Sequence, residues 1–231
     1  MFLRLLVLAV VIAMVPAFLH AQILTPGSPA TLDGPFQVKI FPNLAISPSQ
    51  SVINITNTGA LASPPSMFGG AVGGNICVNV YVFSPDEQEV ACCTCLITPN
   101  GVETTSAGSL ISHTLTPMVP TAVTVKLIAT TPLSGSTCDA STPLITGNVA
   151  PAAGALAEGM VAFGTNVHAA PVGGSISAGT YALTETPFIP STLSTAEVSR
   201  ITTLCGFINA NGSGFGVCPG CTLGAQGAVR Q

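Results

Sequence analysis

Charged and aromatic residues are scarce in this sequence. Its 231 residues contain five Lys or Arg, nine Asp or Glu, two Tyr and no Trp. A nucleic-acid-binding protein needs a basic surface, which five cations cannot form, so this class is excluded. Sugar-binding modules usually stack sugar rings on aromatic side chains, so the shortage of aromatics argues against that class as well. Because few groups titrate, we expect folding stability to depend weakly on pH.

Long apolar runs are also missing after the N-terminus. Leu5–Met14 is apolar, follows Arg4 and is broken by Pro16, and a small-residue cleavage site ends at Ala21. This pattern predicts a secretory signal peptide over residues 1–21. No later run approaches the roughly 18 apolar residues typical of a transmembrane helix. We therefore expect a chain that is secreted to the extracellular space, the periplasm or the cell surface, without a transmembrane segment.

Motifs of the common enzyme classes are lacking too. There is no G-x-S-x-G, H-E-x-x-H, Walker-type loop or dinucleotide fingerprint. After the predicted signal peptide there are two histidines, His113 and His168, each in a strand-like run without an acidic or nucleophilic neighbour. They are best interpreted as partly buried strand histidines. We expect no catalytic activity and no cofactor, and keep a hydrolase with a non-local site as one alternative.

Cysteine, by contrast, is plentiful. Eight cysteines follow the predicted signal peptide, and an even number in an exported chain predicts a disulfide framework. Eight cysteines allow 105 pairings, so the connectivity stays open. The candidates are Cys77, Cys92, Cys93, Cys95, Cys138, Cys205, Cys218 and Cys221.

The segment VACCTCLI (90–97) concentrates three of these thiols in one predicted strand. On a strand Cys93 and Cys95 share a face and Cys92 points the other way, which disfavours a Cys92–Cys93 bridge. With a hairpin loop centred near Asp86 and Glu87, a Cys77–Cys95 cross-strand bridge becomes a candidate.

A thiolate metal site or redox centre is the main alternative to a disulfide framework. Two C-x-x-C pairs, formed by Cys92, Cys95, Cys218 and Cys221, could supply four ligands to zinc. The pairs are far apart in sequence, and in a strand residues i and i+3 point to opposite faces. We therefore expect no metal site.

Alternating apolar and polar residues predict about eight short strands. In the first, PFQVKI, the alternation puts Phe36, Val38 and Ile40 on one face and Gln37 and Lys39 on the other, which indicates a half-buried strand. The others are SVINITNTG (51–59), ICVNVYVF (76–83), VACCTCLI (90–97), a weaker GSLISHTLT (108–116), TAVTVKLIATT (121–131), GMVAFGTNVHA (159–169) and GTYALTETPF (179–188).

One helix is predicted near the C-terminus. Ser194 and Glu197 form a capping box, and Asn211-Gly212 ends the helix. Val198, Ile201, Cys205 and Ile208 recur at helical spacing, so that one face is apolar and Cys205 is placed to join the helix to the sheets.

These elements predict a mainly β fold: a disulfide-stapled β-sandwich, Ig-like or similar, with one C-terminal α-helix. The expected organisation is a signal peptide (1–21), a Pro/Gly-rich lead-in (22–34), the sandwich (35–190), the helix with a Cys-rich closing loop packed on the sandwich (191–222) and a flexible tail (223–231).

Three segments resemble uncharacterised secreted bacterial proteins with a CCxC hairpin and a C-terminal CxxC. They are GNICVNVYVFSPDEQEVACCTCLITPNG, ISHTLTPMVPTAVTVKLIATTP and LSTAEVSRITTLCGFINANGSGFGVCPGC, and they cover much of residues 75–221. The resemblance implies export and a bacterial source, and carries over no catalytic residue. We predict an exported structural or interaction module whose partner is a protein or cell-envelope surface, including further copies of itself.

Overall fold

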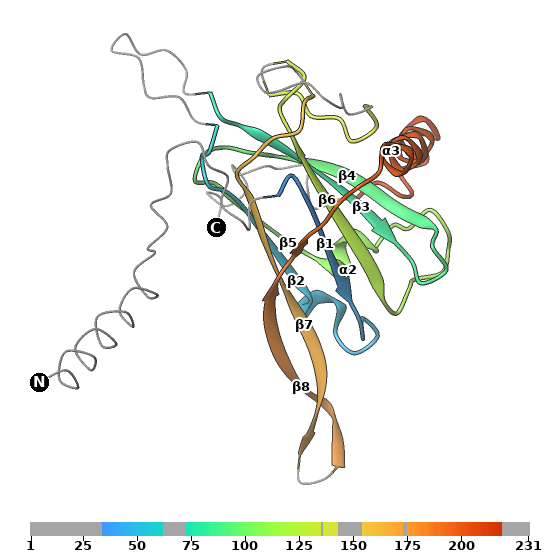
Figure 1. The fold of residues 1–231 in the computed structure, drawn as a ribbon. Coiled ribbons are helices and arrows are strands. Elements are labelled where there is room, and N and C mark those ends of the chain that lie inside the picture. Colours follow the sequence, from blue (N-terminus) through green and yellow to red (C-terminus); the bar gives the residue numbers. More distant parts are fainter. Residues whose placement is uncertain (1–33, 62–72, 135, 143–153, 173–174, 219–231) are drawn as a thin grey trace, which may run out of the picture. The chain divides into compact units, whose positions relative to one another are not determined.

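The computed structural model describes residues 34–61, 73–134, 136–142, 154–172 and 175–218 (Figure 1). The predicted signal peptide, nearly all of the lead-in and the tail lie outside this range. The strands are β1 (Phe36–Phe41), β2 (Val52–Asn57), β3 (Ile76–Phe83), β4 (Glu89–Ile97), β5 (Val102–Ser106), β6 (Val123–Thr130), β7 (Met160–Val172), β8 (Ser175–Pro187) and β9 (Ile189–Pro190). The helices are the short 3-10 turn η1 (Pro48–Gln50), α2 (Ala107–Leu110) and α3 (Thr195–Ala210).

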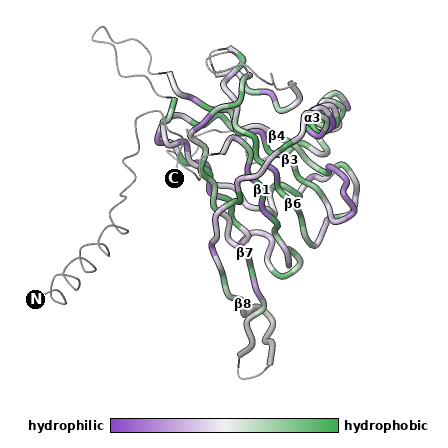
Figure 2. Tube along the Cα trace, in the orientation of Figure 1, coloured by the Kyte–Doolittle hydropathy of each residue, from purple (hydrophilic) through white to green (hydrophobic). Residues whose placement is uncertain are grey.

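The strands form two antiparallel sheets that share one core. The first sheet has the order β4-β3-β6-β1-β9 and the second β5-β2-β7-β8. Inward side chains of both sheets, such as Val80 and Leu127 from the first and Ile53 and Ile55 from the second, belong to one buried cluster. Figure 2 shows hydrophobic residues along the strands of the five-stranded sheet. The mainly β, disulfide-linked fold with a C-terminal helix is therefore confirmed.

The five-stranded sheet is covered on both faces. Every residue of β3 is buried, although its sequence alternates as predicted. One face packs on the second sheet, and the other packs under α3 and the loop around Ala140, where Tyr81, Ile201 and Ile208 form a second cluster. The Tyr81 hydroxyl donates to the Ala140 carbonyl at 2.7 Å, which satisfies its one polar group.

The helix α3 begins and ends where the sequence predicts. The Ser194 hydroxyl accepts from the backbone N–H of Glu197 at 3.2 Å, and Gly212 follows the helix with a positive φ of 65°. The four predicted apolar positions are all buried against the sheet. The Glu197 side chain, however, turns away from the cap and binds Lys126 of β6 and Arg200 of α3.

The predicted half-burial of β1 holds only in part: on its apolar face Phe36 is buried and Val38 partly buried, but the polar face is buried as well. Gln37 and Lys39 face the interior between the sheets, whereas Ile40, on the apolar face, is 62% exposed. The second sheet provides the partners that make this possible. Gln37 Nε2 donates to the Met160 carbonyl at 2.7 Å, and Lys39 Nζ donates to Thr186 Oγ1. Alternation defines two faces of a strand, and these later residues decide which face is inside.

The weaker strand predicted over 108–116 is also wrong. The segment begins with α2, because the Ser106 hydroxyl accepts from the Ser109 N–H and starts a helical turn. Leu110 and Ile111 pack into the core from this turn. The strand in this region is β5, which lies before the predicted segment and which the sequence patterns did not indicate.

Candidate interaction surface

Three disulfides join distant parts of the chain. They are Cys77–Cys138, Cys92–Cys205 and Cys93–Cys218. Cys95 is also disulfide-bonded, and Cys221, the one remaining cysteine of the sequence, lies outside the described residues. The adjacent cysteines of β4 therefore point to opposite faces of the sheet. Cys92 is bonded to Cys205 of α3, and Cys93 is bonded to Cys218 in the segment after α3.

The candidate Cys77–Cys95 bridge is wrong. In the hairpin register Cys95 lies opposite Val78, and Cys77 lies opposite Leu96. Directly opposed residues share a face, so the Cys95 side chain points into the core with Val78 while Cys77 points outward. The outward Cys77 reaches the loop that contains Cys138 instead.

The alternative thiolate site does not assemble in this structure. Of its four cysteines, Cys92 and Cys218 belong to two different disulfides, and a disulfide sulfur is not a thiolate ligand. A different group, Glu89 with Cys92 and Cys205, brings three ligand atoms within 4.8 Å of one another. Two of these atoms are the bonded sulfurs, so Glu89 alone offers a free donor.

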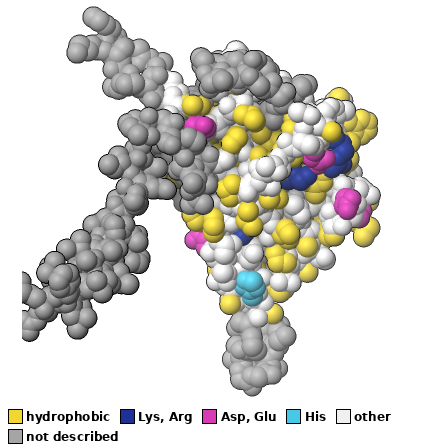
Figure 3. All heavy atoms as spheres, in the orientation of Figure 1, with side chains coloured by type: hydrophobic (Ala, Val, Ile, Leu, Met, Phe, Trp, Pro, Cys, Tyr) yellow, Lys and Arg dark blue, Asp and Glu magenta, His cyan; other side chains and the backbone are white. Residues whose placement is uncertain are grey.

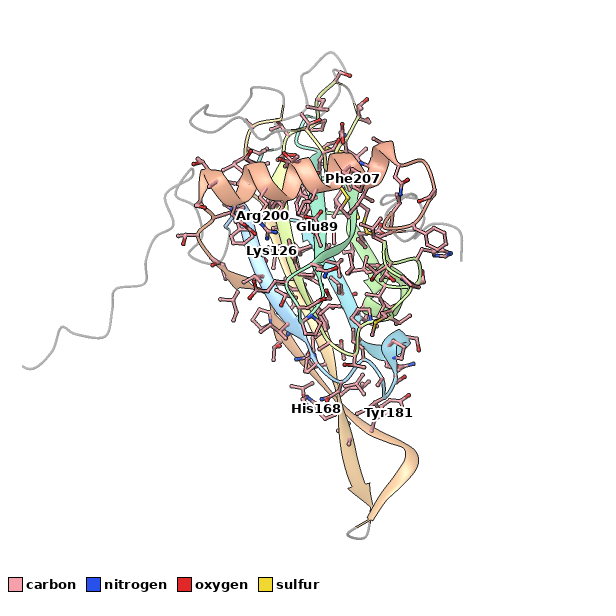
Figure 4. All side chains as sticks on the ribbon, turned by 90° about the vertical axis from the view of Figure 1, so that its right-hand side faces the viewer. Glu89, Lys126, His168, Tyr181, Arg200 and Phe207 are labelled. Carbon is pink, nitrogen blue, oxygen red and sulfur yellow. A yellow bond between two sulfur atoms is a disulfide. The ribbon has the colours of Figure 1, made fainter. Side chains whose placement is uncertain are left out.

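Glu89 is the most unusual charged group in the described part of the chain. Its side chain lies beneath α3 beside Lys126 and Arg200 (Figure 4), and neither carboxylate oxygen has a hydrogen-bond partner among the described residues. Burial raises the pKa of Glu89 to about 8, with Arg200 and Lys126 opposing the rise and Glu197 adding to it. Glu89 lies opposite Phe83, where the register of the hairpin shifts by one residue.

Nearby, Glu197 has the opposite electrostatic environment. Its carboxylate binds Lys126 Nζ at 2.6 Å and Arg200 Nε at 2.8 Å. The hydrogen bond from Arg200 is the largest cause that lowers the pKa of Glu197, to about 2. Both cations also lie over the Phe83 ring. This cluster fixes the N-terminal half of α3 to the sheet.

Neither histidine lies in a catalytic arrangement with the residues that the structure describes. His113 is exposed in a turn after α2, and its Nδ1 lies 3.0 Å from Ser112 Oγ. His168 lies on β7 and is exposed (Figure 4). The interpretation as partly buried strand histidines is therefore wrong for His113, whereas His168 lies on a strand as predicted but is exposed. No described carboxylate is hydrogen-bonded to either ring.

Most sheet edges are short or covered. β9 has two residues and β5 has five. The long edge of β4 is covered: the Cys92 N–H donates to the Gly216 carbonyl at 2.8 Å, and the Leu115 N–H donates to the Val90 carbonyl at 2.9 Å. On the same edge of β7, past the residues that pair with β2, the side-chain amide of Asn43 donates to the Val167 carbonyl at 3.4 Å.

The edge of β8 differs from all of these. It has 13 residues, pairs only with β7 and contains a single charged residue, Glu185. Among the described residues, no backbone hydrogen bond from Tyr181–Pro187 leads away from β7. Natural edge strands are usually short, covered or rich in Lys, and an edge without these features is a template for another strand.

The ladder shows which β8 groups are free to pair. The Phe188 N–H donates to the Ala162 carbonyl, so the hydrogen-bonded pairs with β7 continue at Thr186, Thr184 and Ala182. The N–H and C=O groups of Tyr181, Leu183 and Glu185 then point to the open edge. Tyr181 and Leu183 have 37% and 50% of their surface exposed.

The only charge of β8 is held away from this edge. Glu185 Oε1 accepts from the Asn54 amide at 3.3 Å, and Asn54 lies on β2, on the far side of β7. Most of the Lys and Arg atoms visible in Figure 3 lie beside α3, and the coloured surface next to the hairpin is mostly hydrophobic or uncharged. The approach of an uncharged strand to β8 therefore meets little electrostatic resistance.

A groove lies between two loops, away from β8. Residues Ser84–Gln88 and Thr116–Thr121 line a groove of about 540 Å³, which is large enough for a small molecule. Its floor has no buried, unpartnered polar group, and Met118 and Val119 are exposed on it. The polar side chains of Ser84 and Asp86 on its wall are hydrogen-bonded to each other.

No match to this chain was found among protein-family models, curated proteins or solved structures. The resemblance to secreted bacterial proteins stays a prediction. None of the described helices is both long and apolar enough to cross a membrane.

Proposed function

We propose that this protein is an exported structural or interaction module that binds a partner protein by accepting a β-strand along the open edge of β8. The observation that carries the proposal is the row of outward backbone groups at Tyr181, Leu183 and Glu185, on the one long edge that the described residues leave uncovered. In strand addition, main-chain hydrogen bonds supply affinity and the alternate side chains supply selectivity.

The disulfides support the extracellular part of the proposal. Cys92–Cys205 and Cys93–Cys218 are the kind of long-range bridges that form and persist in oxidising compartments. They also hold α3 and the segment after it on β4, so that this edge stays closed while β8 stays open. Rigid support on one side and a free edge on the other suit a binding module.

The groups on the outer face next to the edge also favour a protein partner. Phe163, Leu183 and Tyr181 are exposed on this face, one on β7 and two on β8. Exposed apolar residues beside unpaired backbone groups would be buried together by an added strand. A small polar substrate would find no enclosed site there.

A capture experiment with an edge-blocked variant tests the proposal. Leu183→Pro removes the outward N–H of Leu183 while leaving the ladder with β7 unchanged, because a proline is tolerated where the N–H faces solvent. We expect the immobilised, oxidised wild-type protein to retain specific proteins from the exported and envelope fractions of its host. Leu183→Pro should retain none of them.

The control is Val102→Lys, a change on the opposite edge of the same sheet. It should retain the same partners as the wild type, and thermal unfolding of all three proteins should show that each is folded. Equal retention by wild type and Leu183→Pro would contradict strand addition at β8.

A further inference from the structure

We propose that the strand accepted by β8 is the β8 strand of a second copy of this chain, in an antiparallel, two-fold symmetric pairing centred on Leu183. The inference rests on the proposed function and names its partner. The dimer would join the two four-stranded sheets into one continuous sheet of eight strands.

The hydrogen-bonding pattern of β8 matches itself in this register. A centre at Leu183 pairs Leu183 with Leu183 of the second copy, and Tyr181 with Glu185. All three residues direct their N–H and C=O groups to the open edge, so each pair can exchange two hydrogen bonds. Six bonds would form from residues that bond to nothing on that side in the described chain.

Proline limits this pairing at one end of the strand. Pro187 has no N–H to donate and would lie opposite Gly179 of the second copy, where the ladder would weaken. A centre nearer the hairpin tip would place Glu185 opposite residues beyond Tyr181, where the regular pairing of β8 with β7 is interrupted. The Leu183 register uses all of the outward groups between Tyr181 and Pro187.

The charges permit two identical edges to meet. Glu185 would face Tyr181 of the second copy rather than the other Glu185, and its carboxylate is drawn back toward β2 by Asn54. In this register the two Glu185 Cα atoms would be about 14 Å apart, four residues along the strand direction. Screening in physiological salt weakens exposed charges at such a distance.

The side chains would also pack. Leu183 of each copy would lie against the other on the outer face, next to Val167 of each β7. On the inner face of β8, Lys39 Nζ donates a hydrogen bond to Thr186 Oγ1, which fixes the strand to the facing sheet. A hydrophobic cross-strand pair at the centre of a symmetric ladder is a stabilising arrangement.

Sedimentation of the oxidised mature protein, over a wide range of concentrations, tests the pairing. The wild type should pass from monomer to dimer as the concentration rises. Leu183→Lys puts two ammonium groups directly opposite each other and should weaken dimerisation at least about tenfold. Val102→Lys changes the net charge equally at the far edge and should dimerise as the wild type does.

Cross-linking tests the register. Leu183→Cys would bring two new thiols together at a Cα separation of about 5.5 Å, within the range of a disulfide. Mild oxidation of the folded variant should give a covalent dimer on a non-reducing gel. Glu185→Cys is the matched control and should stay monomeric, because its two Cα atoms are too far apart.

A wild type that stays monomeric at every concentration, or Glu185→Cys dimers that form as readily as those of Leu183→Cys, would overturn the proposal. The proposed function fails separately. If the protein is monomeric but Leu183→Pro still abolishes capture of host proteins, strand addition stands and the partner is a different chain.

Discussion

The side chain of Lys39 lies against the backbone of Gly164, so closely that a Cβ on Gly164 would stand 2.5 Å from Lys39 Cδ and 2.7 Å from Phe41 Cζ. The two residues come from facing sheets, β1 and β7. A lysine can lie between the sheets here because the facing residue on β7 is a glycine, which has no side chain. Burial lowers the pKa of Lys39, and its ammonium group is held by Thr186 Oγ1 and the nearby Phe41 ring.

Replacing Gly164 should therefore be costly. Gly164→Ala would force Lys39 and Phe41 out of their positions and should lower the free energy of unfolding by about 1–3 kcal/mol. Urea denaturation gives this value. Gly206→Ala is the matched control: its Cβ would meet only Ser141 Cβ at 3.6 Å, and alanine in a helix is favoured by up to about 1 kcal/mol. Similar losses for both variants would contradict the close contact.

Glu89 should make stability depend on pH more strongly than the small number of titrating groups predicts. The unfolded chain releases this proton near the ordinary pKa of 4.5, whereas the folded protein keeps it until about pH 8. The stabilisation is therefore complete below about pH 4.5 and is lost as the pH rises toward 8. Glu89→Gln should remove this slope and raise stability at pH 8 by about 1–3 kcal/mol.

The measurement is urea denaturation of both proteins at intervals between about pH 5 and 8. Glu103, whose pKa burial also raises, is common to both proteins, so their difference isolates Glu89. Glu87→Gln, two residues away on the exposed hairpin loop, should leave the profile unchanged. Parallel profiles for wild type and Glu89→Gln would show that the carboxyl is not buried as described.

Removing the disulfide of α3 should loosen the helix. In Cys92→Ala/Cys205→Ala, the bridge that joins residues 113 positions apart is lost, and stability should fall by about 2–5 kcal/mol. Limited proteolysis should then cut within α3, which packs on the sheet through its apolar face. In Cys77→Ala/Cys138→Ala, α3 should stay resistant. Equal cleavage of α3 in both variants would contradict this assignment.

The disulfide framework also predicts an absence of metal dependence. Thiol titration of the denatured, unreduced protein should find no free cysteine, and a chelator should leave thermal unfolding unchanged. Zinc that copurifies with the protein, together with about four free thiols, would instead support a thiolate site.

Local patterns predicted most of the strands and the helix α3, though not β5 or α2, and they failed where distant residues decide. The N-cap at Ser194 and the alternation in β3 depend on near neighbours, so the sequence predicts both. The inward direction of Gln37 and Lys39 depends on Met160 and Thr186, more than a hundred residues later. Alternation alone carries no information about them.

The candidate site was beyond sequence reasoning for a related reason. The segment 179–188 is predicted as a strand, but its place at the end of the order β5-β2-β7-β8 is a property of the whole sheet. Likewise, the faces of Cys92 and Cys93 follow from strand geometry, whereas their partners Cys205 and Cys218 are set by where α3 packs. A scan for long strands with a single charge could have marked β8.

The cover over β4 has a consequence for biogenesis. Cys218 comes 125 residues after Cys93, and at a synthesis rate of about 5–20 residues per second the covering segment emerges roughly 6–25 s after β4. During most of that interval a nascent chain exposes the edge of β4 and the thiols of Cys92 and Cys93, whose partners are made last. Premature oxidation or strand exchange between nascent chains would occur in this interval. Chaperones would therefore be needed most before the last cysteines are synthesised.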